Sequence, residues 1–213
     1  MKKLFIIKKK SSTRSPKKEN SPVMLPRSGY EPEFNPKKYN GPLCKRHNCM
    51  AYALNIKSEN SPQFLQLKSN IANSSFMLNK TSNLKGKSLK TQQCLFTELI
   101  FHRMFPNSYR TTADVKCKPG FYKIAILNSP QRKTSGGKHV WHDFHFVRQN
   151  SDVLWSHKPG QTAITRVNSN NKPILDPRTA KWSYNNLKYK FCSFFCVPKN
   201  FKPIQQNFTP RSI

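Results

Sequence analysis

The chain has 213 residues and carries 38 lysine and arginine residues against nine acidic residues, which gives a formal net charge of +29. Its length allows one domain of ordinary size, alone or with terminal tails. The 36% hydrophobic and 12% aromatic content excludes a wholly disordered basic protein, so we expect a folded core. Self-repulsion at this charge predicts that a polyanion, or less basic subunits of a large assembly such as a capsid, surrounds the working protein.

The first 40 residues contain 11 basic and three acidic residues, repeated proline and no periodic apolar pattern. This composition predicts a basic extended arm over residues 1–40 with a net charge of +8, which leaves +21 on the rest of the chain. Residues 15–18 (Ser-Pro-Lys-Lys) resemble basic turns of histone tails that lie in the DNA minor groove, although a solvated tail explains them equally well. The residues that we assign to nucleic-acid binding are Lys8, Lys9, Lys10, Arg14, Lys17 and Lys18.

The N-terminal apolar run has four residues, where a signal peptide needs roughly 7 to 15. No stretch approaches the ~20 apolar residues of a transmembrane segment. We therefore expect an intracellular, soluble protein, or one that is packaged in a virion. In that compartment the six cysteines are expected to be mostly reduced, and disulfides become an option only in a particle released from the cell.

The predicted domain covers residues 41–200 and is followed by a basic tail at 201–213. Asn48 is placed to cap its first helix, and Pro106 ends its second. A polar excursion rich in serine, asparagine and lysine separates the two helices. The pattern predicts helices at 49–54 and 91–104 and strands at 121–127, 145–148, 153–157 and 191–197. These elements predict an α+β fold with a small antiparallel sheet.

Several kinds of site are excluded or disfavoured. There is no glycine-rich dinucleotide fingerprint, and Gly86-Lys87-Ser88 has Thr81 where a phosphate-binding loop needs glycine. His139, His142 and His145 recur every third residue, but a strand would point them in different directions and no acid or cysteine completes a zinc site. We expect no cofactor and no metal.

The informative constellation is Cys49 at a predicted helix start, followed by His145 and His157 on consecutive antiparallel strands. The helix dipole and backbone N–H groups favour a thiolate at that position, and one imidazole is suited to act as base while the other orients it. The Cys49 amide N–H is a candidate oxyanion-hole donor. The competing interpretation is that Cys49 packs as a small hydrophobic residue. Cys192 and Cys196, with Cys44 as a possible partner, could bind zinc or form a disulfide, but their apolar neighbours favour burial. Lys158 is expected to be solvated.

This arrangement resembles the NlpC-type cysteine peptidases of the papain-like superfamily over residues 42–160. The resemblance rests on the helix-starting Cys49, on Pro119-Gly120-Phe121 before a strand, and on the His145 to His157 separation. It implies a papain-like α+β fold with Cys49 as nucleophile, His145 as base and His157 as the orienting residue. The family's usual Asp-Cys-Ser-Gly is replaced here by the sequence at 48–51, Asn-Cys-Met-Ala.

Two functions follow as hypotheses. The first is a thiol hydrolase that cleaves an amide, isopeptide or ester bond, on a basic chain that binds nucleic acid or another polyanion. The alternative is a virion structural protein, either a minor capsid or a DNA-packaging component, that keeps the scaffold without needing its activity. A third, weaker hypothesis is a nucleic-acid binder that stacks bases on exposed aromatic residues, but no RNA-binding sheet signature is present.

Overall fold

The computed structural model describes residues 24–39, 47–56, 88–129, 132–133, 139–140, 143–184 and 187–200. Several sequence-based predictions lie outside these residues, and the structure does not bear on them. They are the six basic residues assigned to nucleic-acid binding, most of the polar excursion (57–87) and the tail 201–213.

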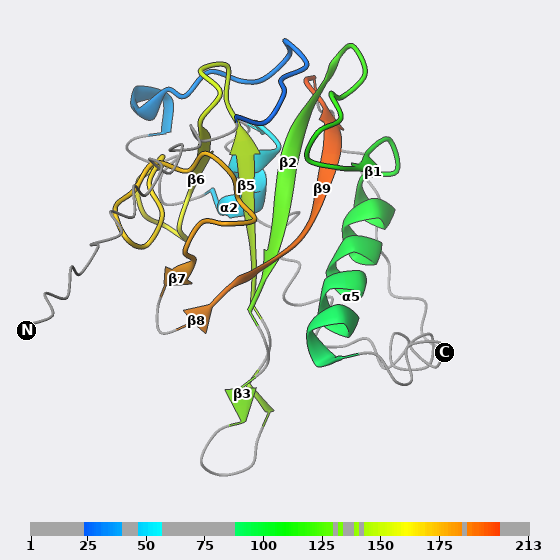
Figure 1. Cartoon of the computed structure of the whole chain (residues 1–213), viewed down its shortest axis with the longest axis vertical. Coiled ribbons are helices and arrows are strands. Elements are labelled where there is room, and N and C mark those ends of the chain that lie inside the picture. The colour runs from blue at the N-terminus through cyan, green and yellow to red at the C-terminus, as the bar shows by residue number, and fades with distance from the viewer. Residues whose placement is uncertain are drawn as a thin grey trace, which may run out of the picture.

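A five-stranded sheet, in which every neighbouring pair is antiparallel, forms the centre of the molecule (Figure 1). Its order is β1-β9-β2-β5-β6, so that β2 is the central strand. Aromatic and β-branched residues are frequent in β2 and β9, because such side chains pack well on a pleated surface. The strands are β1 (Tyr109–Thr111), β2 (Phe121–Asn128), β5 (Phe144–Gln149), β6 (Trp155–His157) and β9 (Lys190–Pro198).

The two described helices pack on one face of this sheet. α2 (Cys49–Ala53) contacts β5 and β6, and α5 (Leu89–Met104) contacts β2 and β9. In Figure 1, α2 lies behind β5 and α5 runs below β1. Both helices were predicted, and their caps explain their starts: the Asn48 side chain accepts from two amides of α2, and the Ser88 hydroxyl accepts from one amide of α5. Phe101 of α5 lies in the core with apolar residues of α2, β2 and β5.

The opposite face of the sheet is covered by segments that have little regular structure. Leu25, Ile174 and Trp182 pack there in a second apolar cluster. Leu25 is only 5% exposed, so the described part of the predicted arm 1–40 lies against the body instead of extending away from it. The composition of 40 residues does not reveal this, because a few buried side chains suffice to fix the segment. The same segment contains the short 3-10 helix η1 (Pro36–Tyr39).

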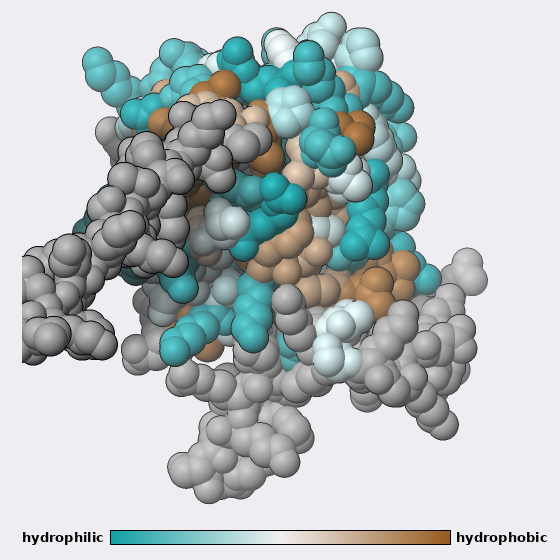
Figure 2. Space-filling model, viewed as in Figure 1, coloured by the Kyte–Doolittle hydropathy of each residue, from teal (hydrophilic) through white to brown (hydrophobic). Residues whose placement is uncertain are grey.

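The predicted strands at 121–127, 145–148 and 191–197 are confirmed. The strand predicted at 153–157 begins only at Trp155, because Val153 has a φ of 67° in the preceding turn. Two small hairpins complete the described structure: β3 (Arg132–Lys133) with β4 (His139–Val140), and β7 (Ser183–Tyr184) with β8 (Leu187–Lys188). Figure 2 shows hydrophilic residues over much of the described surface and a group of apolar residues near the centre of the view.

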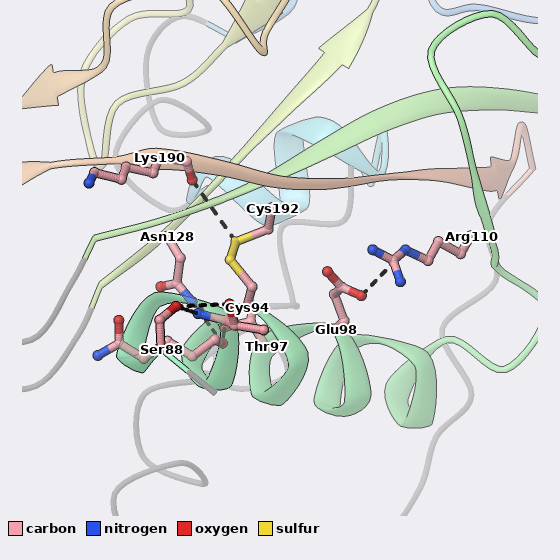
Figure 3. Close-up of a disulfide and its surroundings, with 10 residues drawn as sticks. Ser88, Cys94, Thr97, Glu98, Arg110, Asn128, Lys190 and Cys192 are labelled. Carbon is pink, nitrogen blue, oxygen red and sulfur yellow. Dashed lines mark hydrogen bonds and ion pairs between the residues drawn. A yellow bond between two sulfur atoms is a disulfide. The ribbon is translucent and has the colours of Figure 1, made fainter. Parts of the chain in front are cut away.

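Four cysteines form disulfides, which corrects the expectation that the cysteines are mostly reduced. Cys94 of α5 is bonded to Cys192 of β9 (Figure 3), and Cys117 is bonded to Cys196, with Cα separations of 5.4 and 5.6 Å. The partners are 98 and 79 residues apart in the sequence, so only the packing of distant elements brings them together. Cys49 is the one free thiol in the part of the chain that the structure describes.

The α+β class and its antiparallel sheet are confirmed. Neither α2 nor α5, the α-helices within the described ranges, has the apolar length that a membrane crossing requires.

Candidate active site

Cys49 is the first residue of α2 and is almost enclosed by its surroundings. Its side chain is 7% exposed and belongs to the core beneath the helices. Burial raises the pKa of the thiol to about 12, and the Asp143 charge acts in the same direction. The backbone amides of Phe146, Met50 and Cys49 itself lower the pKa by a smaller amount. The resting thiol is therefore protonated at neutral pH, and the amide of the residue that follows His145 lies beside it.

His145 and His157 lie side by side on adjacent strands. The β5–β6 register pairs Val147 with His157, so His145 is two residues along β5 on the same face of the sheet. Their rings stand almost perpendicular with centroids 4.9 Å apart, and His145 Nε2 lies 2.8 Å from His157 Nδ1. The hairpin thus brings the two predicted histidines together.

The neighbours of His157 determine which nitrogen carries each proton. His157 Nε2 is 3.1 Å from the carbonyl oxygen of Val167, which can only accept, so this nitrogen carries a proton. In the neutral ring, Nδ1 then accepts the proton of His145 Nε2. His145 Nδ1 keeps its lone pair, and this is the form that a general base requires.

Both imidazoles are neutral at pH 7. Burial, together with the nearby His157 charge, holds the pKa of His145 well below its ordinary value. Burial also lowers the pKa of His157 to about 4, although its hydrogen bond with Val167 opposes this shift. The site therefore holds a neutral thiol and a neutral histidine pair, with no thiolate–imidazolium pair at rest.

Aromatic residues enclose the histidine pair. The rings of Trp182, Tyr184 and Tyr189 have centroids within 6.2 Å of the His145 ring. The Tyr184 hydroxyl lies 3.2 Å from His157 Nε2 and shares this nitrogen with the Val167 carbonyl. Because these residues follow His157 by more than 20 positions, the spacing that revealed the histidines gave no signal for them.

Asp143 connects the thiol to this aromatic group. Its Oδ2 accepts a 2.7 Å hydrogen bond from the Tyr189 hydroxyl, and its Oδ1 accepts from the Phe144 amide at 3.1 Å. Burial raises the pKa of Tyr189, and the charges of Asp143 and Cys49 raise it further. Asp143 thus bonds to Tyr189 on the histidine side of β5, while its charge also acts on the Cys49 thiol on the helix side.

The structure does not join the predicted nucleophile directly to its base. No hydrogen bond between described residues connects the Cys49 thiol with either histidine ring. Phe144 and Phe146 pack in the core with Cys49, so the alternation of β5 turns the His145 side chain toward the other face. The backbone amide of Phe146 is the point at which β5, the strand that carries His145, comes close to the Cys49 thiol.

Lys158 corrects the prediction of a solvated side chain. It is fully buried, and its ammonium donates a 2.6 Å hydrogen bond to the Gly160 carbonyl. The turn after β6 folds back over the long side chain, which the sequence pattern did not indicate. In the described ranges no group of three histidine, cysteine or acidic residues is placed to hold a metal ion, and His142 lies outside those ranges.

Comparisons with known proteins give little guidance. No protein-family profile matches the chain, and no solved structure matches it. One short stretch is 44% identical over 43 residues to "Insoluble matrix shell protein 1" of Ruditapes philippinarum. This similarity covers 19% of the present chain and 29% of the shell protein.

Proposed function

We propose that this chain is a papain-like thiol hydrolase domain that acts on an amide, isopeptide or ester bond. The observation that carries this proposal is the ordered series from the Val167 carbonyl through His157 to His145, which leaves His145 Nδ1 as a proton acceptor. The position of Cys49 at a capped helix start, beside the Phe146 amide, supports it further.

The chemistry starts from neutral groups. At rest Cys49 and His145 lie on opposite faces of β5, so the reaction requires a rearrangement at the start of β5 that brings the two side chains together. As the Cys49 sulfur then attacks the acyl carbon, its proton passes to His145 Nδ1, and His157 orients the imidazolium that forms. The amide N–H of Cys49 is suited to stabilise the oxyanion. Collapse of the intermediate transfers the proton to the leaving group, and a thioester remains. His145 then removes a proton from water, which attacks the thioester, releases the acid and restores the thiol.

Because the thiol is buried in the core beneath the helices, substrate must displace side chains to reach it. A resting pKa of about 12 predicts little spontaneous thiolate, so alkylation by iodoacetamide at neutral pH should be slow. An acyl donor that binds should react faster than this, because proton transfer to His145 accompanies the attack.

The test is acylation of the full chain by p-nitrophenyl acetate at pH 7.5, followed by mass spectrometry of its peptides. We expect one acetyl group on Cys49 in the wild type and none at this position in Cys49→Ala. His145→Gln should slow acylation by about 100-fold, the lower end of the range for general-base catalysis. His102→Gln is the matched control, because His102 is an exposed histidine of α5. Acetylation of lysines alone, or an unchanged rate in His145→Gln, would exclude the hydrolase.

As a second function, we propose a disulfide-bonded component of an extracellular matrix that binds acidic polymers. The short similarity to a shell matrix protein favours it, as do the two disulfides, which are typical of oxidising compartments, and the charge of +29. The same charge supports the capsid or DNA-packaging role inferred from the sequence. Cys49→Ala separates these functions from hydrolysis, because they do not need the thiol. Unchanged polymer binding together with lost acylation would support both proposals.

A further inference from the structure

A cavity of about 480 Å³ lies at the edge of the sheet, where β1 ends beside β9. The last pair between these strands joins Thr111 to Phe194. Ser193 and Cys192, which precede Phe194 in β9, lie beyond the end of β1 and line the cavity. None of the residues assigned to the thiol site lines it. Any role of this cavity is therefore separate from hydrolysis.

Ser193 is the unusual member of the cavity wall. It is 3% exposed, and its hydroxyl has no hydrogen-bond partner in the described structure. A buried hydroxyl without a partner destabilises the folded state, and such groups are rare in native proteins. Its oxygen has less than 1 Å² of accessible surface, so an acceptor on a bound molecule would satisfy it once the side chain turns toward the cavity.

Two arginine residues, Arg178 and Arg110, line the same cavity. Arg178 uses Nε and Nη2 to bind the Asp176 carboxylate, at 2.6 to 3.1 Å, so Nη1 has no hydrogen bond within the described residues. Arg110 lies 3.7 Å from Glu98 (Figure 3), which is beyond hydrogen-bond distance. Asp176 holds the Arg178 guanidinium in place, Arg110 is largely exposed beside Glu98, and most donors of both arginines stay available.

The rest of the wall combines hydroxyl groups with apolar surface. Thr111 adds a hydroxyl, whereas the Thr112 hydroxyl already donates to Asp114 at 2.8 Å. Phe191 and Phe194 add aromatic surface. Guanidinium and hydroxyl donors facing an aromatic wall suit an oxyanion attached to an apolar group.

We propose that this cavity binds an oxyanion, either a carboxylate or a sulfate or phosphate ester, that is carried by a partly apolar molecule. The Ser193 hydroxyl and the free donors of Arg178 and Arg110 bind the oxygens, and Phe191 and Phe194 contact the apolar part. Because Glu98 and Asp176 offset two positive charges, the site selects by hydrogen-bond geometry more than by net charge.

The experiment is a calorimetric titration of the full, oxidised chain with benzoate, phenyl sulfate and phenyl phosphate at constant ionic strength. Ser193→Ala should weaken binding by about fivefold, and Arg178→Gln by about tenfold. Arg166→Gln is the matched control, because Arg166 pairs with Asp152 as Arg178 does with Asp176 but lies outside the cavity. The affinity of this control variant for each compound should stay within about twofold of the wild-type affinity.

A second measurement separates a binding role from a structural one. Without ligand, Ser193→Ala should raise the thermal midpoint, because the change removes an unpaired buried hydroxyl. With ligand, the same variant should gain less stability than the wild type. Binding of benzoate alone, or of the esters alone, would support the site and identify the group. Absence of binding by all three compounds at millimolar concentration, or equal affinity in wild type, Ser193→Ala and Arg178→Gln, would overturn the proposal. Because Cys49→Ala leaves the cavity intact, failure here is distinct from failure of the hydrolase.

Discussion

Two buried, neutral histidines make the stability of this domain depend on pH. The pKa of His157 is about 4 in the folded chain, against an ordinary value of 6.5. As the pH falls below 6.5, the unfolded chain takes up a proton that the folded chain does not, so the folded state loses stability until about pH 4. The loss from this one group corresponds to about 3 kcal/mol.

We expect urea unfolding to show this loss between pH 7 and pH 4.5. The free energy of unfolding should fall more steeply in the wild type than in His157→Gln, which lacks the titrating group. Far-UV circular dichroism at each pH gives the measurement. Equal pH dependence in the two proteins would contradict the assignment of a lowered pKa to His157.

Arg148 is the other residue whose environment the structure reveals. It is fully buried, and its guanidinium donates to the carbonyls of Tyr52 and Glu33 and to the side chains of Asn150 and Asn55. It also lies 4.0 Å from the centre of the Tyr52 ring. This one side chain therefore connects α2, the segment before it and the β5–β6 turn.

Arg148→Lys should lower the free energy of unfolding by about 3 kcal/mol, because a single ammonium group cannot donate to all four of these acceptors. Chemical denaturation monitored by fluorescence measures the change. Arg166→Lys is the control: its ion pair with Asp152 is exposed, and we expect an effect below about 1 kcal/mol. If the two substitutions cost the same, the Arg148 contacts do not stabilise the fold.

At the scale of elements, β9 is the strand that ties the domain together. It pairs with β1 and β2 and carries one cysteine of each disulfide. The Cys94–Cys192 bond holds α5 to this strand. Cys192 lies at a register shift in the β2–β9 pairing, between the β9 residues that pair with Ile126 and Leu127. The helix is thus fixed to the sheet by a covalent bond as well as by apolar packing.

Replacing Cys94 and Cys192 together by alanine should lower the free energy of unfolding by about 3 kcal/mol, since the bond closes a long loop in the unfolded chain. Denaturant unfolding with and without a reducing agent measures this change. Non-reducing peptide mapping checks the pairing directly. A midpoint that reduction leaves unchanged in the wild type, or a map with other pairings, would contradict this assignment.

At the scale of the whole molecule, charge is the dominant property. The net charge is +29, and only +8 of it belongs to residues 1–40. Deleting residues 1–23, which lie outside the described structure, leaves most of the charge on the body. The body should therefore bind polyanions without its N-terminal segment.

We expect binding to double-stranded DNA or heparin to weaken as salt rises, with a linear fall of log affinity against log salt concentration. The chain without residues 1–23 should keep most of this slope. A fluorescence anisotropy titration at several salt concentrations measures it. A slope near zero would exclude polyanion binding through the basic residues.

The local elements were largely predictable because each has its own signal in the sequence. Asn48 before an apolar run predicted α2, and the apolar runs predicted β2 and β9. The spacing of His145 and His157 predicted their contact, because a tight hairpin leaves little freedom of register.

Contacts between distant segments were not predictable in this way. Tyr189 joins Asp143, and Cys94 joins Cys192, only because β9 returns to the centre of the sheet. Residues 1–40 were predicted to form an extended arm and Lys158 to be solvated, yet packing buries both Leu25 and Lys158.

The sequence by itself therefore determined the charge, the main helices and strands and the histidine pair, since these depend on composition and short-range pattern. Only the tertiary structure decided the disulfides, the aromatic enclosure of His145, the pKa of Cys49 and the cavity beside Ser193. The physical reason is that burial and pairing depend on which remote segments meet, and a linear pattern does not specify the partner across the sheet.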